Sequence, residues 1–221
     1  MKKVSTALAA LLLCAGAQAA TVSFQYGLPL VQSTTEINQT GTLGLFNSAL
    51  GTLTGASITV FGGATFSYTG KNNGATAANS NLTASTTLLW DSSINALDAF
   101  LLDQIALSDS SGIQNYAVGQ MRSFGPTAKT GQLTDDLASI LGSLQAAGGG
   151  NFTLNCESIS GIAVQGGGGN IATTQATTAG CGAMITYTFT PTTTGVPEPT
   201  SLALAGLALL GVGFASRRNK A

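Results

Sequence analysis

The feature that most restricts the fold is the alternation of side chains in several short segments. In residues 21–26 (TVSFQY) and 185–190 (ITYTFT), an apolar or aromatic side chain occupies every second position, with Thr, Ser or Gln between. A period of two is typical of a β-strand that buries one face. Val, Ile, Phe, Tyr and Thr are also the residues that strands favour. We therefore expect a mainly β domain.

Further segments carry the same signal between glycine-rich breaks. The expected strands are residues 56–61, 64–70, 82–90, 151–160, 161–165 and 182–191. The pair Gly62-Gly63 predicts a hairpin between the first two of these strands. The pair Asn73-Gly74 predicts the next turn. Residues 108–115 (SDSSGIQN) offer oxygen ligands without the spacing of an EF-hand, so we expect a plain turn there.

Two segments favour helix because their apolar residues recur three and four positions apart. The first is residues 93–107, with Ser92 or Ser93 as its N-cap. The second is residues 134–146, where two aspartates at the start suit the helix dipole. We expect one or two short helices packed on a sheet, within a single β-rich domain over residues 20–194.

The N-terminus has the three parts of a secretory signal peptide, which we assign to residues 1–19. Two lysines supply positive charge, residues 4–15 are apolar, and Ala17 and Ala19 place small side chains at the positions that a signal peptidase reads. We expect Sec-dependent export, with signal peptidase cutting after Ala19 or, as the second choice, one residue later.

The C-terminal segment, residues 195–221, combines a proline motif, an apolar run and a basic end. As a helix, residues 202–215 would be about 21 Å long, which is short for the roughly 30 Å hydrocarbon core of a bilayer. Arg217 and Arg218 would stay on the cytoplasmic side and act as a membrane stop. The body of the protein would then lie outside.

The order Val196-Pro197-Glu198-Pro199, apolar run, Arg217-Arg218 resembles the PEP-CTERM sorting signal of Gram-negative bacteria. The two prolines keep this motif extended and accessible. The resemblance implies cleavage by an exosortase, a transient stay in the inner membrane through the C-terminal helix, and transfer to the cell surface or extracellular matrix. It also implies a host that makes extracellular polysaccharide. The alternative is a plain weak anchor with a proline linker.

The charge pattern argues against a nucleic-acid partner. Only 8% of the residues are charged, and five of the eight basic residues lie in the two terminal segments. Within residues 20–194, Lys71, Arg122 and Lys129 remain against eight acidic residues, which leaves a net charge of −5. A chain without a basic patch lacks the electrostatic footprint of a nucleic-acid-binding protein.

The cysteines predict one disulfide. Cys14 lies in the predicted signal peptide, so the exported body keeps Cys156 and Cys181. An even pair in an oxidising compartment favours a disulfide, which would close a loop of about 25 residues and stabilise the fold by about 3 kcal/mol. The chain has no histidine and the pair lacks metal-ligand spacing, so we expect no metal site and no cofactor.

The sequence offers no catalytic motif. Without histidine there is no Ser-His-Asp or Cys-His arrangement, and no P-loop or dinucleotide fingerprint occurs. A glycosidase would need two carboxyl groups about 5–10 Å apart. Asp91, Asp98, Asp103 and Asp109 are seven, five and six positions apart and share no helix face. We expect solvated surface acids and no enzyme.

The body also resembles a family. Residues 46–63 (FNSALGTLTGASITVFGG) and 185–192 (ITYTFTPT) are similar to the choice-of-anchor E domain. This resemblance implies a secreted β-sandwich that carries this kind of tail, and it assigns no catalytic residues.

These observations together favour a non-enzymatic exported protein of the cell surface or biofilm matrix, associated with extracellular polysaccharide. The alternative is a secreted carbohydrate-active hydrolase or sugar-binding protein that uses an acidic site. A cleft with two acids, one with a raised pKa, would favour the alternative. A flat face dense in hydroxyl groups would favour the structural role.

The sorting segment yields a first prediction. Glu198→Ala keeps the hydrophobicity and topology of the tail but removes the one charge between the prolines. We expect export and membrane insertion to continue while processing fails, so that uncut protein accumulates in the inner membrane. Changing Arg217 and Arg218 to Ser should instead weaken retention and release uncut protein. Mass spectrometry of the mature C-terminus is the measurement. Wild-type protein outside the inner membrane that still carries residues 202–221 would show a simple anchor.

Overall fold

Antiparallel strands account for most of the chain between residues 19 and 192, the part that the computed structural model describes. The predicted signal peptide, apart from Ala19, and the predicted C-terminal helix lie outside these residues. Ala19 is exposed, and the first strand begins at the next residue. The mainly β, sandwich-like fold expected from the sequence is confirmed.

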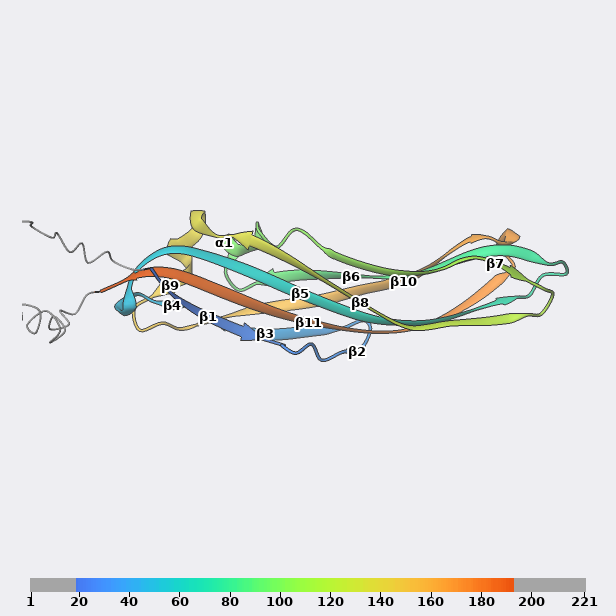
Figure 1. Ribbon diagram of the computed structural model, residues 1–221, viewed down its shortest axis with the longest axis horizontal. Coiled ribbons are helices and arrows are strands. Elements are labelled where there is room, and N and C mark those ends of the chain that lie inside the picture. The colour runs from blue at the N-terminus through green and yellow to red at the C-terminus, as the bar shows by residue number, and fades with distance from the viewer. Residues whose placement is uncertain (1–18, 193–221) are drawn as a thin grey trace, which may run out of the picture. The chain divides into compact units, whose positions relative to one another are not determined.

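Sheet A consists of five strands, four of them in the order β1-β11-β5-β8, with β2 beside β11 (Figure 1). Their bounds are β1 Ala20–Tyr26, β2 Ser33–Thr34, β5 Gly51–Asn72, β8 Met121–Asp136 and β11 Ile171–Pro191. Every pairing in this sheet is antiparallel. The 22-residue β5 is unusually long for a strand, about 70 Å at the usual rise per residue.

Sheet B has four antiparallel strands in the order β3-β10-β6-β7. Their bounds are β3 Asn38–Gly44, β6 Ala78–Ser92, β7 Ile105–Tyr116 and β10 Asn151–Gly166. The short parallel pair β4 Phe46–Asn47 and β9 Gln145–Ala146 forms a third sheet. Four short helical turns complete the described elements: η1 Ser48–Leu50, α1 Asn95–Asp98, η2 Ala138–Leu144 and η3 Gly167–Gly169.

The two sheets bury their facing sides against each other in one core. Alternate side chains of the long strands are buried, as period-two segments require. The largest fully buried side chains include Tyr187 and Phe66 of sheet A and Leu82, Leu88 and Leu154 of sheet B. The Tyr187 hydroxyl donates to the backbone oxygen of Gly44, 2.9 Å away, so this phenol is buried with its hydrogen bond satisfied.

The two ends of the domain are neighbours in sheet A. Ala20, the first residue of β1, pairs with Phe189, near the end of β11. The connections β5–β6, β7–β8 and β10–β11 meet at the opposite, distal end (Figure 1). There the Asn73 amide donates to the Asn170 oxygen over 2.9 Å and the Gly119 amide donates to the Asn72 oxygen over 3.0 Å.

The predicted hairpin at Gly62-Gly63 is wrong, because β5 runs through both glycines without a turn. Neither residue has a positive φ. Gly62 pairs with Cys181 on one side and with Gly131 on the other. A strand that is paired along both edges has no freedom to reverse, so tertiary pairing overrides the local turn signal.

These glycines belong to a wider band, here called the glycine belt: Gly62, Gly63, Gly131, Gly180 and Gly182. On the inner side, a Cβ at Gly62 would overlap Leu88, and one at Gly131 would lie 2.7 Å from Ile105. On the outer side, the segment 27–32 crosses over the other three. The belt therefore lets sheet B and this segment approach sheet A closely from both sides.

The predicted disulfide between Cys156 and Cys181 is present, with the two Cα atoms 6.4 Å apart. Cys156 lies on β10 in sheet B and Cys181 on β11 in sheet A, at the level of the glycine belt. Both sulfur-bearing residues are buried. The bond thus joins the two layers of the sandwich.

Both predicted helices are much shorter than expected. The first is reduced to one turn, α1, and its last apolar residues, Ile105 and Leu107, are buried in β7 instead. The N-cap of α1 is Ile94, and Ser92 accepts the amide of Ile94 at 3.1 Å. In the second, β8 continues to Asp136, whose carboxylate accepts the amide of Ala138 before η2 begins.

The turn predicted for residues 108–115 is also wrong, because this segment lies in the middle of β7. A register shift opposite Asn81 and Thr83 and a positive φ at Gly112 mark an irregularity in the strand. The turn-favouring residues of this segment therefore mark a β-bulge within β7. Among residues 19–192, no helix has the length and apolar character needed to cross a membrane.

The glycine belt yields a stability prediction with a matched control. A Cβ at Gly180 would lie 2.5 Å from the backbone oxygen of Val31, so Gly180→Ala must displace the segment 27–32. We expect the free energy of unfolding to fall by about 1–3 kcal/mol. Gly55→Ala, also in a strand, places its Cβ 3.8 Å from its nearest neighbour and should change little. Urea unfolding of both variants is the measurement, and equal stabilities would contradict the packing role of the belt.

Candidate functional site

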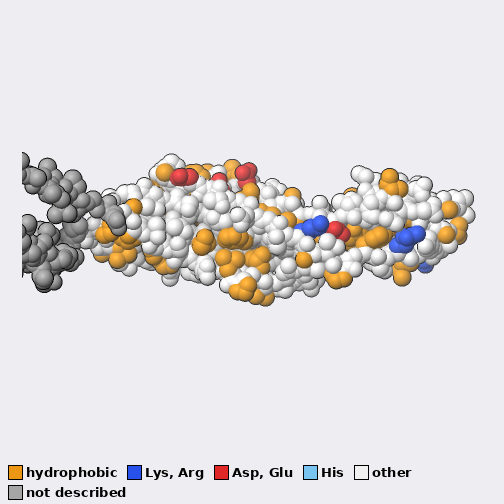
Figure 2. Space-filling model, in the orientation of Figure 1, with side chains coloured by type: hydrophobic (Ala, Val, Ile, Leu, Met, Phe, Trp, Pro, Cys, Tyr) orange, Lys and Arg blue, Asp and Glu red, His pale blue; other side chains and the backbone are white. Residues whose placement is uncertain are grey.

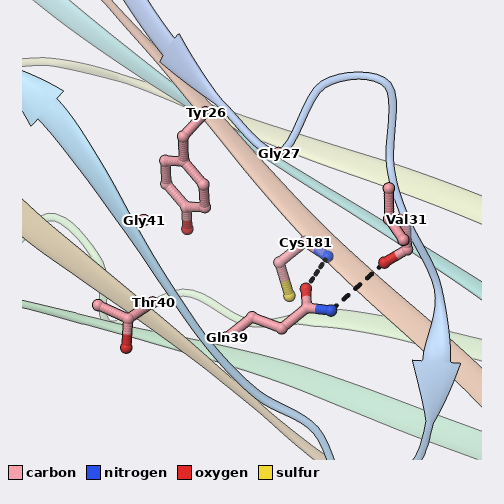
Figure 3. A pocket seen from close by; sticks show the side chains of 7 residues that line it. All are labelled: Tyr26, Gly27, Val31, Gln39, Thr40, Gly41 and Cys181. Carbon is pink, nitrogen blue, oxygen red and sulfur yellow. Dashed lines mark hydrogen bonds between the residues drawn. The ribbon is translucent and has the colours of Figure 1, made fainter.

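A pocket of about 440 Å³ opens between the edge strands of the two sheets (Figure 3). Tyr26 and Gly27 at the end of β1 form one wall, and the start of β3 forms the other. The lining residues are Tyr26, Gly27, Val31, Gln39, Thr40, Gly41 and Cys181. This volume falls in the range of small-molecule sites, roughly 300–1,000 Å³.

Gln39 ties the walls of this pocket together. Its Oε1 accepts the backbone amide of Cys181 over 2.9 Å, and its Nε2 donates to the backbone oxygen of Val31 over 3.3 Å (Figure 3). The side chain thus links β3 of sheet B to β11 and to the segment before β2. Because both ends of the amide are engaged, Gln39 acts mainly as a structural bridge.

Tyr26 supplies the aromatic part of the pocket. Its ring lies against Gly41, where any Cβ would overlap it. Burial raises the pKa of the Tyr26 hydroxyl to about 12, so the group is neutral at physiological pH. Its oxygen is buried and has no hydrogen-bond partner within the described protein. The pocket therefore presents neutral groups, which suits binding of an uncharged molecule better than acid–base catalysis.

A second, smaller hollow of about 270 Å³ lies on the outer face of sheet B. It brings together two acids, Asp91 and Glu157, with Asn155 between them. Asp91 is paired with Asn155 in the β6–β10 register, so Glu157 is its diagonal neighbour. Glu157 also accepts the side-chain amide of Asn38 over 2.7 Å. Sequence reasoning missed this pair because the register of the two strands creates it.

The other aspartates that could have served a catalytic pair are dispersed. Asp98 accepts the backbone amide of Ser92. Asp109 accepts the Tyr68 hydroxyl and forms an ion pair with Lys129 at 3.6 Å. Asp103 lies near Asp135, whose pKa is raised by burial first and by the Asp103 charge second. No group of three or more His, Cys, Asp or Glu residues within 19–192 could hold a metal ion.

Three pairs of hydroxyl groups lie on parts of the outer face of sheet A that the segment 27–32 leaves open. Three cross-strand pairs are within hydrogen-bond distance: Ser23–Thr186 at 2.8 Å, Thr59–Thr134 at 2.9 Å and Thr69–Thr174 at 2.6 Å. All three pairs are exposed to solvent. Figure 2 shows one face of the protein on which charged side chains are few, one basic and one acidic group lying side by side. The alternation of Thr with apolar residues in the sequence was the signal for this face.

The predicted sorting residues Val196, Pro197, Glu198 and Pro199 lie outside the described residues, as do Arg217, Arg218 and Ala17. The signal-peptide cleavage site and the roles of these residues therefore stay predictions. The motif begins a few residues after β11, the strand that pairs with β1 at its end. The domain thus joins both terminal segments at the same end of sheet A.

Comparison with protein families identifies the C-terminal segment. Residues 195–218 match the family model of the PEP-CTERM protein-sorting motif. The chain is therefore an exported β-sandwich protein with a C-terminal sorting signal that an exosortase processes. It is a PEP-CTERM protein. The resemblance of the body to the choice-of-anchor E domain stays a prediction.

Comparisons of the whole chain add little. No curated protein matches it. Among solved structures, infectious bursal disease virus Gx strain is 11% identical with a TM-score of 0.18, and the VP2 subviral particle of the same virus is 12% identical with a TM-score of 0.13. Each match covers 87% of this chain and 47% of the viral chain, so the chain spans about half the length of these relatives. Scores this low carry no structural conclusion.

Tyr26 of the pocket and Tyr187 of the core yield a prediction, because within the described residues the Tyr187 hydroxyl has a hydrogen-bond partner and the Tyr26 hydroxyl has none. Tyr187→Phe removes a hydroxyl that donates to Gly44, so the free energy of unfolding should fall by about 1 kcal/mol. Tyr26→Phe removes a buried hydroxyl without a partner, so stability should be unchanged or rise by up to about 1 kcal/mol. Urea unfolding compares the two. A loss for Tyr26→Phe equal to that for Tyr187→Phe would reveal a partner that the hydroxyl reaches in solution.

Proposed function

We propose that this protein is a non-enzymatic component of the cell surface or extracellular matrix, where its domain contacts extracellular polysaccharide. The observation that carries the proposal is the set of exposed hydroxyl pairs on the outer face of sheet A. Polysaccharides are themselves rich in hydroxyl groups, and an array of exposed donors and acceptors can bond to many such groups along a chain. Each bond contributes little, so affinity comes from their number.

The position of the domain ends supports this role. Both terminal segments join the domain where β1 pairs with the end of β11. An anchor held through the C-terminal segment would therefore leave the long strands and the distal loops free to project from the point of attachment. The hydroxyl pairs Ser23–Thr186, Thr59–Thr134 and Thr69–Thr174 lie at successive levels along this length.

The alternative is a carbohydrate-active enzyme that uses Asp91 and Glu157. Diagonal neighbours in an antiparallel sheet lie about 7–8 Å apart, which overlaps the separation of glycosidase carboxyls. Two observations weigh against it. The hollow, at about 270 Å³, is smaller than most ligand sites, and Glu157 is engaged by Asn38 at 2.7 Å. If the hollow were catalytic, Asp91→Asn and Glu157→Gln would each abolish release of reducing sugar.

The experiment tests the hydroxyl face with an isosteric change. The variant combines Thr59→Val, Thr69→Val, Thr134→Val and Thr174→Val, which keep the β-branched shape but remove one hydroxyl from each exposed position. The probe is the extracellular polysaccharide purified from the producing strain, and co-sedimentation measures binding. We expect the variant to bind at least about tenfold more weakly, because each lost hydrogen bond contributes about 0.5–1.5 kcal/mol.

A matched control carries Thr42→Val, Thr83→Val, Thr87→Val and Thr153→Val on the outer face of sheet B, and it should bind like wild type. Dextran serves as an unrelated neutral polysaccharide. Equal loss in both variants would point to a general effect of hydrophobicity, and no binding by wild type would overturn the proposal.

A further inference from the structure

A groove of about 380 Å³ lies on sheet A, in the half of the sandwich that ends in the distal loops. Its lining includes Ser67 and Thr69, which alternate with buried residues of β5 and so lie on the outer face of the sheet. Ser123 of β8 and Thr174 of β11 also line it, and both are paired with Thr69 in the register. No residue of the segment 27–32 lines the groove. Its volume falls in the range of small-molecule sites.

The hydroxyl groups of this groove have capacity for a ligand. Those of Thr69 and Thr174 lie 2.6 Å apart, and this bond uses only one of their two hydroxyl hydrogens. The hydroxyls of Ser67 and Ser123 form no hydrogen bond within residues 19–192. Four hydroxyl groups on adjacent strands can therefore donate to, and accept from, a hydroxylated ligand.

Lys71 lies at the distal end of the same groove. It is exposed and follows Thr69 by two residues on the same face of β5, about 7 Å along the strand. Its cross-strand neighbours are Met121 of β8 and Ala172 of β11, both exposed and uncharged. Within the part of the chain that the structure describes, the Lys71 ammonium has no ion-pair partner. An exposed point charge beside a row of hydroxyl groups suits an anionic group carried by a hydroxylated molecule.

The charges of the domain are divided along its strands. Three segments lead to the distal loops and back: residues 66–84, 110–127 and 162–177. They contain two basic residues, Lys71 and Arg122, and no acidic residue. The other residues of the described part carry eight acids and one base, Lys129, so the two parts have net charges of +2 and −7. On the face shown in Figure 2, basic groups and no acidic group appear toward the distal end.

Two carboxylates border this distal half, and both are engaged. Asp109 on β7 accepts the Tyr68 hydroxyl over 3.1 Å and pairs with Lys129 at 3.6 Å, so its charge is balanced. Glu36 accepts the amide of Ser160 in sheet B. Neither carboxylate lines the groove. The two basic residues therefore set the charge of the groove.

We propose that this groove binds an acidic polysaccharide. A carboxylate or sulfate of one sugar lies at Lys71, and hydroxyls of the adjoining sugars bond to the four hydroxyl groups of the groove. This inference rests on the proposed contact with extracellular polysaccharide and adds the charge of the polymer and the place where it binds. An anionic polymer is attracted to the distal half and repelled by the rest of the domain. The groove is thus its main binding site, and the hydroxyl pairs nearer the termini contribute less.

An anionic lipid surface is the competing kind of partner. Met121, which is 62% exposed, lies opposite Lys71 and would suit acyl chains. The four hydroxyl groups favour the sugar, because acyl chains would cover them without offering hydrogen bonds.

The test uses the exported protein purified from the extracellular fraction, with co-sedimentation as the measurement. The probes are the polysaccharide of the producing strain, before and after its carboxyl groups are reduced to alcohols, and dextran sulfate beside dextran. We expect binding of the acidic polymers to be at least about tenfold tighter than binding of their neutral counterparts. Binding should weaken between about 0.01 M and 1 M salt, as the Debye length falls from about 30 Å to about 3 Å. Loss on carboxyl reduction assigns a carboxylate, whereas retention together with binding of dextran sulfate assigns a sulfate.

Variants at exposed positions test the place of binding. Lys71→Gln should weaken binding of the acidic polymer about tenfold, because it removes a charged hydrogen-bond donor, and Lys71→Arg should retain it. Ala172→Glu places a carboxylate opposite Lys71 and should cause a similar loss. Ala106→Glu is the matched control: it lowers the net charge by the same one unit as Lys71→Gln, at an exposed position of sheet B, and should bind like wild type. Unchanged circular-dichroism spectra check that all four variants fold.

The outcomes separate this inference from the proposed function. Wild-type binding that responds neither to carboxyl reduction, salt nor Lys71→Gln would overturn the inference and leave the polysaccharide contact standing. Equal losses in Lys71→Gln and Ala106→Glu would overturn it as well, since they would reflect net charge alone. Wild type that binds none of the polymers would overturn both. Binding of phosphatidylglycerol vesicles without binding of the acidic polymers would overturn the inference in favour of a lipid surface.

Discussion

The close contact between the two sheets at the glycine belt is the constraint on which the rest of the sandwich depends. The strands of sheet A are long and carry many small or hydroxylated side chains. The core therefore contains few large side chains for its length. At the belt, Leu88 and Ile105 of sheet B fill the space that Gly62 and Gly131 leave empty. The Cys156–Cys181 bond holds the layers together at the same level. Dense packing and a covalent link thus coincide at the level of the glycine belt.

Sequence patterns predicted the strands well where one face is buried, because alternation reports burial directly. These patterns failed where the same residue type favours two different structures. Gly62-Gly63 looks like a turn locally, yet the same glycines are needed for close packing between strands paired on both sides. The helical spacing in residues 93–107 arose from two adjacent elements, a single turn at α1 and the start of β7, whose buried residues together mimic one helical face.

The candidate sites likewise differ in whether the sequence predicted them. The exposed hydroxyl pairs follow from alternating threonines and were foreseeable, and the disulfide followed from the two cysteines that remain after the predicted signal peptide. The pocket was not foreseeable, because Tyr26, Gln39 and Cys181 come from three strands whose register no local pattern specifies. The pairing of Asp91 with Asn155, which places Glu157 nearby, depends on register in the same way. A feature that depends on one type of side chain can be predicted from the sequence. A site that depends on which residues of different strands lie side by side cannot.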